Sequence, residues 1–307
     1  MALFFQGAND LILEQCSDPS SNSNPEYFLT RHVNFNWRID FNTKTISACV
    51  AYEMIPFDLY TTPDQMLVFD VKDLEISKVC INQMEAKWLL TDGPYPELGN
   101  CLKIHLPRQT QSFTLHIEYR TSPQSSALQW LDAAMTADKQ KPFLFTQCQS
   151  IHARSLFPCQ DTPRVKFTYT ATVCADPCMT VLMGAKYFMD PNACPSSGQP
   201  VHKFEQPMPI PNMRYEDDKL ELCIINGGSR GPSQIGPRSR VWAEPSVVGK
   251  AAYEFGEVDK IISAAERLCG PYQWGNYDIV VLPPSFPYGG MENPCLTFVT
   301  PCLLVSV

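Results

Sequence analysis

Strict alternation of apolar and polar residues is the feature of this sequence that most limits its fold. Over residues 165–173 every second residue is apolar, so the apolar side chains of an extended chain would share one face. Similar alternating runs occur earlier, and turn-forming residues separate them. This arrangement predicts an antiparallel sheet domain with one buried face. The alternating segments are residues 45–54, 65–70, 112–119 and 165–173.

The pattern changes in the last third of the chain. Residues 226–233, Asn-Gly-Gly-Ser-Arg-Gly-Pro-Ser, form the strongest linker signal in the sequence. We therefore predict two domains, covering residues 1–226 and 227–307.

The segment beyond the linker is typical of an α/β unit. Residues 239–243 and 277–282 read as strands. Between them, apolar residues recur at helical spacing over residues 248–268, with Ser246 as the expected N-cap and Gly270 at the end. A single helix between two strands is therefore expected here, although Gly256 weakens its centre by about 1 kcal/mol relative to alanine.

Composition excludes several classes of function. The 24 Lys and Arg against 32 Asp and Glu give a net charge of −8, and no long basic run occurs, which argues against nucleic acid and membrane surfaces as partners. No run reaches the roughly 18 apolar residues of a membrane span. The 13 cysteines are odd in number and include no CxxC pair. Free thiols in a reducing cytosol are therefore expected, and we predict a cytoplasmic protein.

Three segments of the sequence resemble one enzyme family. They are residues 125–130, residues 145–163 with Gln-Cys-Gln-Ser at 147–150, and the stretch from residue 234 onward with Tyr-Gly-Gly-Met-Glu-Asn at 288–293. Together they resemble the zinc aminopeptidases related to leukotriene A4 hydrolase and aminopeptidase B. The resemblance implies a saddle-like N-terminal antiparallel β domain followed by a thermolysin-like catalytic domain. The predicted fold class is therefore mixed β and α/β, with an incomplete catalytic domain.

The resemblance also implies that residues 288–293 recognise the free amino group of a peptide. Glu292 would supply a carboxylate, and a charge-assisted pair with an ammonium favours a free N-terminus over an internal peptide bond. The glycines lack Cβ and allow backbone to approach a ligand closely, and the backbone beside them would pair with an extended peptide as an added strand. The alternative is a Gly-Gly turn followed by a surface glutamate. The predicted substrate-binding residues of this motif are Tyr288, Gly289, Gly290, Met291, Glu292 and Asn293.

A second group of candidate substrate-binding residues lies at 147–150. The resemblance implies that Gln147, Cys148, Gln149 and Ser150 reach from the N-terminal domain into the active-site cleft. An amide can accept from an ammonium and donate to a carbonyl, so Gln149 is the expected second contact for the substrate amine. The alternative is a polar loop that pairs with its own backbone. No Cys–His–acid pattern supports Cys148 as a nucleophile.

The family's metal helix is missing from this sequence. A catalytic zinc needs three protein ligands and an open position for water. No HExxH occurs, and no two histidines are four residues apart as on one face of a helix. The resemblance implies zinc in the complete family member, but none is expected on this chain. The histidines are His32, His105, His116, His152 and His202.

These observations leave three functional hypotheses. The first is the N-terminal portion of a zinc aminopeptidase, truncated before HExxH and inactive alone, whose complete form acts on peptides with a free N-terminus and on a lipid epoxide as a further substrate class. The second is a non-catalytic isoform that binds peptide N-termini or a protein partner. The third is a truncated product that never accumulates. A polar stretch at residues 212–219 also departs from the family pattern, which has an apolar strand there.

Overall fold

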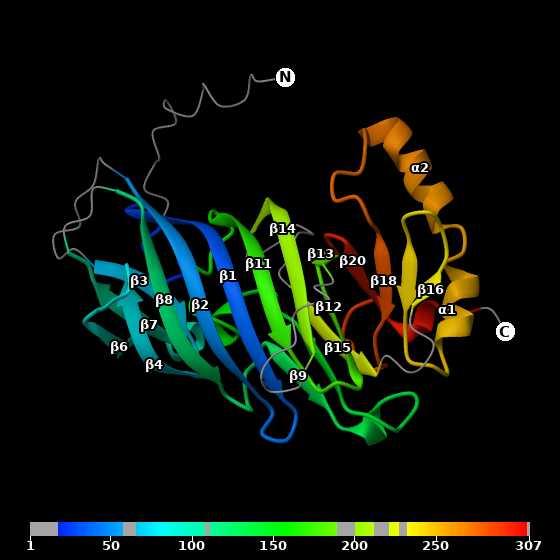
Figure 1. Ribbon diagram of the computed structural model, residues 1–307, viewed down its shortest axis with the longest axis horizontal. Coiled ribbons are helices and arrows are strands. Elements are labelled where there is room, and N and C mark those ends of the chain that lie inside the picture. The colour runs from blue at the N-terminus through cyan, green and yellow to red at the C-terminus, as the bar shows by residue number, and fades with distance from the viewer. Residues whose placement is uncertain are drawn as a thin grey trace.

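The computed structural model describes residues 18–57, 66–107, 111–188, 200–211, 221–226 and 232–305. Strand is the commonest regular structure in the described chain and is arranged in four sheets, with two α-helices near the C-terminal end (Figure 1). The predicted mixed β and α/β fold class is confirmed. The polar stretch at 212–219 and most of the 226–233 linker lie outside the described residues, so the domain boundary stays a prediction.

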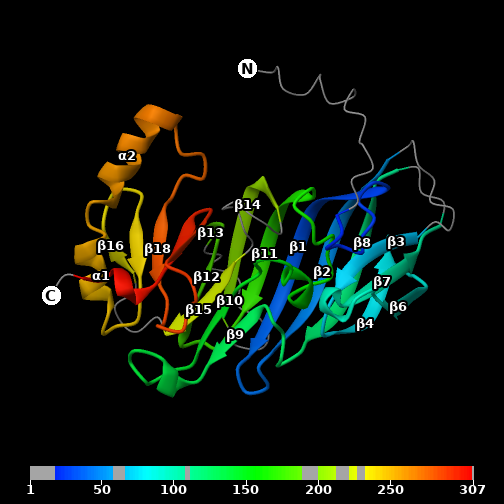
Figure 2. The ribbon, with the colours of Figure 1, turned by 180° about the vertical axis from the view of Figure 1, so that it is seen from behind.

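The largest sheet has eight strands and carries the main hydrophobic core. Its strands alternate buried and exposed residues as the sequence predicts, and Trp37, Phe35 and Tyr169 are fully buried on its inner face. Figure 2 shows from behind how these strands cross the middle of the molecule. In sheet order they are β13 (Lys186–Phe188), β14 (Val201–Pro211), β11 (Lys166–Cys174), β1 (Phe28–Asp40), β2 (Thr45–Pro56), β8 (Phe113–Thr121), β4 (Leu74–Ile81) and β5 (Met84–Glu85).

One pairing in this sheet departs from the antiparallel pattern. Strands β1 and β11 run parallel, with Val33 opposite Tyr169 and Phe35 opposite Ala171. Parallel neighbours need a long crossover connection, and here the crossover contains β2 to β10. Alternation within each strand reports which face is buried but carries no information about this partner.

Two smaller sheets complete the N-terminal part. A three-stranded sheet of β3 (Met66–Val71), β7 (Asn100–His105) and β6 (Trp88–Asp92) lies beside β4 and β8. A four-stranded sheet has the order β12 (Met179–Met183), β15 (Leu222–Asn226), β10 (Phe143–Thr146) and β9 (Leu128–Leu131). Short 3-10 turns lie at Pro96–Leu98, Ala133–Met135 and Ala153–Ser155.

A buried arginine ties the loops of the N-terminal part together. The Arg154 side chain is fully buried and donates from Nε to Asp161 Oδ2 at 2.8 Å, from Nη1 to Leu98 O at 2.9 Å and from Nη2 to Ser20 O at 2.7 Å. Asp70, also fully buried, lies 3.7 Å from Nη1. Buried charges require such partners because the interior solvates them poorly.

The C-terminal part contains a mixed five-stranded sheet with two helices packed beside it. The sheet order is β16 (Ser233–Gln234), β17 (Arg240–Trp242), β18 (Asp278–Val281), β20 (Leu296–Val299) and β19 (Gly290–Asn293), with β17, β18 and β20 mutually parallel. The helices are α1 (Val248–Glu254) and α2 (Val258–Cys269), and a 3-10 turn follows at Pro301–Leu303.

The single helix predicted over residues 248–268 is wrong, because the structure has two helices. The break covers residues 255–257 and contains Gly256, whose backbone freedom lowers the cost of leaving the helix. The N-cap is Val247, without a side-chain hydrogen bond, and not the expected Ser246.

One hydrophobic cluster joins the four-stranded sheet to the C-terminal sheet. Phe145 of β10 contacts Phe286 edge to face, with ring centroids 5.8 Å apart, and Phe286 contacts Phe298 of β20 in the same way at 6.3 Å. Met291 of β19 is buried in this cluster. The end of β10 and the start of β19 therefore lie together, although about 145 residues separate them in the sequence.

Candidate functional site

The two predicted substrate segments meet where these sheets touch. Residues 147–150 begin as β10 ends, and residues 288–293 lead into and form β19. The Gln147 side chain donates from Nε2 to Met291 Sδ at 3.5 Å. This contact brings both segments to one place on the molecule.

Gln147 organises the first segment. It is buried, its backbone N–H donates to Ala127 O at 2.9 Å, and its Oε1 accepts from the backbone N–H of Gln149 at 2.8 Å. Gln149 is half-buried and Ser150 is exposed. The side chain of Gln147 is therefore structural, and Gln149 and Ser150 are the members of this segment that a ligand can reach.

Cys148 faces inward. It is 1% exposed, and its backbone N–H donates to Glu221 Oε1 at 3.2 Å. A buried thiol is poorly placed to attack a ligand, in agreement with the expectation that Cys148 is not a nucleophile.

Strand β19 lies at the edge of its sheet. It pairs with β20 in antiparallel register, with Met291 opposite Phe298 and Asn293 opposite Leu296, and no strand in the described part of the chain pairs with its other edge. An edge strand presents unpaired N–H and C=O groups that can template an added strand. The geometry therefore suits an extended peptide where the backbone of β19 is accessible, which the burial pattern limits to Gly290 and Glu292.

The side chains of β19 alternate between core and surface. Met291 and Asn293 point into the interior, and the exposure of these whole residues is only 3% and 2%. Glu292 points to the other face and is exposed. None of the ion pairs within 4.0 Å among the described residues includes Glu292. Its carboxylate is available for a cation.

The two glycines before Glu292 have different surroundings. A Cβ at Gly290 would lie 3.2 Å from Glu292 Oε1, so the glycine leaves room for the carboxylate to fold back along the strand. A Cβ at Gly289 would meet no atom of the described chain within 4 Å, so the space beside it is open. Tyr288, 40% exposed, stacks edge to face on Phe286 with ring centroids 5.9 Å apart.

Glu221, at this junction, was missed from the sequence. Glu221 is fully buried and accepts from the Cys148 N–H and from the Thr146 hydroxyl. Neither side-chain atom of Asn293 has a hydrogen-bond partner among the described residues, and the same holds for the Thr297 hydroxyl. The only sequence signal for Glu221 is an acidic residue directly before an apolar run, which more often marks a surface position.

The turn between β19 and β20 contains an unreactive cysteine. Cys295 is 2% exposed, and burial raises the pKa of its thiol to about 12. It is therefore protonated near neutral pH, whereas a nucleophile or metal ligand must be a thiolate. Its backbone carbonyl accepts from the Asp278 N–H at 2.9 Å and helps to hold the turn.

The described residues do not fit a catalytic zinc site. In the described ranges no three His, Cys, Asp or Glu side chains come together in a way that could hold a metal ion. The histidines lie on separate elements, for example His32 on β1, His116 on β8 and His202 on β14. No step of a reaction is assigned to a metal on these residues.

Comparisons with known proteins place these features in a family. The Peptidase M1 N-terminal domain matches residues 29–212, and the Peptidase family M1 domain matches residues 253–307. Leukotriene A-4 hydrolase of Xenopus laevis is 40% identical over 94% of this chain, and leucine aminopeptidase 2 of Pyricularia oryzae is 39% identical over 94%. The structure of yeast leukotriene A4 hydrolase in complex with bestatin superimposes with a TM-score of 0.83, 35% identity and 94% coverage of this chain.

The match covers only part of each relative. The chain spans about half the length of the curated relatives, 46% of the Xenopus protein and 45% of the Pyricularia protein, and 43% of the yeast structure. The family resemblance seen in the sequence is confirmed on both matched regions. This chain belongs to the M1 peptidase family and corresponds to the N-terminal part of its leukotriene A4 hydrolase-like members.

Proposed function

We propose that this chain supplies the part of an aminopeptidase that binds the free N-terminus of a peptide, and that the complete protein removes N-terminal residues with a bound zinc ion. The contact between Gln147 and Met291 supports this proposal most directly, because it joins both predicted substrate segments beside an edge strand. The exposed carboxylate of Glu292 on that strand supplies the matching charge.

The residues of this chain would act by binding and orientation. Glu292 would pair with the substrate ammonium in a charge-assisted hydrogen bond, and the Gln149 amide would add a second, neutral contact. The free edge of β19 would align the following residues of the peptide as an added strand. A peptide whose N-terminus is acetylated loses the charge that Glu292 recognises.

Titration of the 307-residue chain with a dipeptide amide that has a free N-terminus tests this proposal. Glu292→Gln should weaken binding by about 1 kcal/mol, and Gln149→Ala by less, because only the carboxylate pairs with full charge and this carboxylate is exposed. The N-acetylated dipeptide should bind both variants and the parent equally poorly. Glu257→Gln, which removes an exposed carboxylate outside β19, is the matched control. Equal affinity of Glu292→Gln and the parent for the dipeptide would favour the alternative that residues 288–293 form a Gly-Gly turn with a surface glutamate.

We further propose that the 307-residue chain alone does not hydrolyse peptides. The absence of HExxH from its sequence supports this. Metal analysis should find no stoichiometric zinc, and turnover of aminoacyl arylamides should stay at background. About one equivalent of zinc with chelator-sensitive turnover would contradict the proposal.

A binding module without catalysis is the second candidate for this chain. The assembly of Gln147, Met291 and the free edge of β19 on the same chain favours it. Both candidates predict dipeptide binding that depends on Glu292, without arylamide turnover, for the 307-residue chain. Arylamide turnover after fusion of a family segment that contains HExxH would favour the aminopeptidase.

The substrate range and location are also proposals. One relative is named leukotriene A-4 hydrolase, which supports a lipid epoxide as a second substrate class of the complete protein. The eleven cysteines among the described residues are all free, which supports a cytoplasmic location. None of the described helices is long and apolar enough to cross a membrane.

A further inference from the structure

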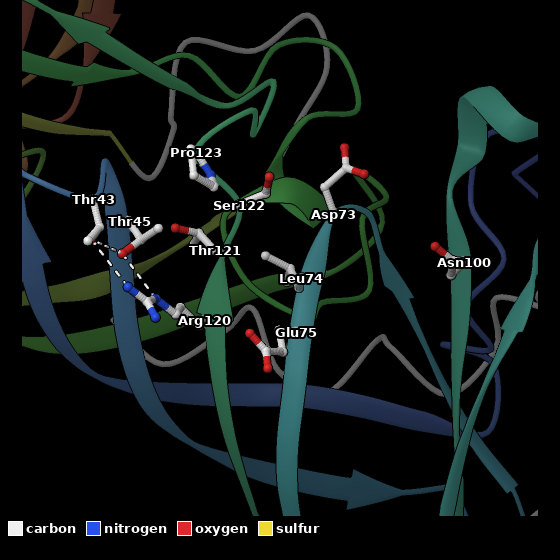
Figure 3. Close-up of a pocket in the computed structure, with 10 residues that line it drawn as sticks. All are labelled: Thr43, Thr45, Asp73, Leu74, Glu75, Asn100, Arg120, Thr121, Ser122 and Pro123. Carbon is white, nitrogen blue, oxygen red and sulfur yellow. Dashed lines mark hydrogen bonds between the residues drawn. The ribbon is translucent and has the colours of Figure 1, made fainter.

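A pocket lies in the N-terminal part of the molecule. It has a volume of about 590 Å³, within the range of small-molecule sites. Strand ends from two sheets surround it, and none of its residues belongs to the candidate site beside β19. Figure 3 shows the lining residues, which are Thr43, Thr45, Asp73, Leu74, Glu75, Asn100, Arg120, Thr121, Ser122 and Pro123.

Arg120 of β8 is held in this pocket by hydroxyl groups. Its Nε donates to Thr45 Oγ1 at 3.1 Å and its Nη2 donates to Thr43 Oγ1 at 3.2 Å (Figure 3). A guanidinium has five N–H donors in a fixed plane. Two are used, so both hydrogens of Nη1 and one of Nη2 remain for a ligand. A planar fork of this kind matches a carboxylate.

Two carboxylates complete the charge of the pocket. Glu75 of β4 is the direct cross-strand partner of Arg120, so their side chains share one face of the sheet. Asp73 lies in the turn before β4, toward the other end of the pocket from Arg120 (Figure 3). Neither carboxylate, nor Arg120, takes part in an ion pair within 4.0 Å among the described residues.

The pocket therefore presents one cation and two anions that lack ion-pair partners among the described residues. A ligand with complementary charges has one carboxylate and two cationic groups. The carboxylate and one ammonium must lie close together, because Arg120 and Glu75 are neighbours, and the second cation must lie farther off, near Asp73. A free α-amino acid with a basic side chain has this arrangement.

We propose that this pocket binds a free basic α-amino acid, lysine or arginine. The α-carboxylate lies on Arg120, the α-ammonium on Glu75 and the side-chain cation on Asp73. The Ser122 hydroxyl accepts from the Gln124 N–H at 3.1 Å, so its own hydrogen is free to donate to the ligand carboxylate. The three pocket charges are exposed, so binding should be weak, with a Kd above about 1 mM.

Titration of the isotope-labelled 307-residue chain with lysine, followed by the NMR shifts of the Thr121 and Ser122 amides, tests this proposal. These two amides should shift and saturate. Norleucine, which lacks the side-chain ammonium, should bind about 5-fold more weakly than lysine. Nα-acetyl-lysine lacks the α-ammonium and lysine amide lacks the carboxylate, so each should bind at least 5-fold more weakly. Shifts confined to the amides of β19 would overturn the proposal, as would equal binding of lysine and Nα-acetyl-lysine.

Variants separate the three contacts. Arg120→Gln and Glu75→Gln should each weaken lysine binding at least 5-fold. Asp73→Asn should remove only the preference for lysine over norleucine, and asparagine tolerates the positive φ of 55° at this position. Lys78→Gln, which removes an exposed cation paired with Glu118 on the same sheet, should leave binding unchanged.

The same titration distinguishes this pocket from the proposed peptide site. Glu292→Gln should leave the lysine affinity at Thr121 unchanged, whatever its effect on dipeptide binding. Loss of lysine binding in Glu292→Gln with retention in Arg120→Gln would overturn the assignment of the amino acid to this pocket.

Discussion

The N-terminal and C-terminal parts of the described chain differ in how deeply their ion pairs are buried. Arg154 and its partners Asp70 and Asp161 are fully buried, whereas the Arg238 side chain is 30% exposed and pairs near the surface with Glu266 at 2.7 Å. Burial makes an ion pair costly to break, because the partner left behind has neither water nor a counter-charge. Removing one partner of such a contact should therefore cost much more free energy in the N-terminal part than in the C-terminal part.

Apolar side chains are also more deeply buried in the N-terminal part than in the C-terminal part. In β1, alternate residues from Val33 to Ile39 are buried against the main core. In α2, Ile262 is the one buried residue, at 9% exposure, while Ile261 and Leu268 are 66% and 87% exposed. The C-terminal part has a small core of its own between its sheet and α1, and a second cluster that it shares with the four-stranded sheet, whereas the N-terminal part has one large core.

The largest expected effect breaks the buried charge network. Arg154→Met should lower the free energy of unfolding by about 4 kcal/mol, since it leaves Asp70 and Asp161 buried without their cation. Arg238→Met, the same change at the surface, should cost about 1 kcal/mol or less. Denaturant unfolding followed by tryptophan fluorescence measures both values. Equal costs would remove the distinction between the two parts.

Adjacent isoleucines in α2 provide the next test. Ile262→Ala should cost about 2 kcal/mol, because it leaves a cavity beneath the helix. Ile261→Ala should change the free energy of unfolding by no more than about 0.5 kcal/mol, because that side chain is exposed. Hydrogen exchange of the α2 amides localises the loss to the C-terminal part. A loss spread evenly over β1 and β11 would mean that both parts unfold as one unit.

The smallest effect concerns a half-buried histidine in the N-terminal part. Burial, with repulsion from Lys72 and Arg154, lowers the pKa of His152, whose Nδ1 lies 2.8 Å from the Ser126 hydroxyl. The unfolded chain therefore binds this proton more readily than the folded chain. The contribution of neutral His152 to the free energy of unfolding should be fully present above pH 6.5. It should decrease as the pH falls toward the pKa of His152 in the folded protein, by at most about 1.4 kcal/mol per pH unit for one proton. His152→Gln should flatten this slope between pH 7 and 5, and an unchanged slope would assign it to other groups.

The sequence predicted the strands well because alternation is a local property. Residues 165–173 form a strand with Phe167, Tyr169 and Ala171 buried, as their spacing indicates. The parallel partner of that strand was not predictable, since pairing depends on contacts between distant segments. The helix over residues 248–268 failed for a different reason, because a periodic pattern continues across a break that preserves the buried face.

The candidate site was predictable in composition but not in geometry. The motif resemblance identified residues 147–150 and 288–293 as candidates, and the contact from Gln147 to Met291 required the packing of two sheets. The sequence gives no sign that Gly290 makes room for the Glu292 carboxylate or that Glu221 is buried behind Cys148. The roles of these residues in ligand binding stay predictions.

The parallel pairing of β1 with β11 also means that β1 is synthesised long before its partner strand. His32 and Thr168 contact each other across 136 residues, through a hydrogen bond of 2.7 Å. At about 5–20 residues per second, a ribosome needs on the order of ten seconds to make that interval. During this interval the edge of β1 that later pairs with β11 has no partner strand. The hairpin of β1 and β2 is then only marginally stable by itself. A nascent chain that ends before Cys174 therefore presents an open strand edge to chaperones and to other chains, and a slightly longer one can close it.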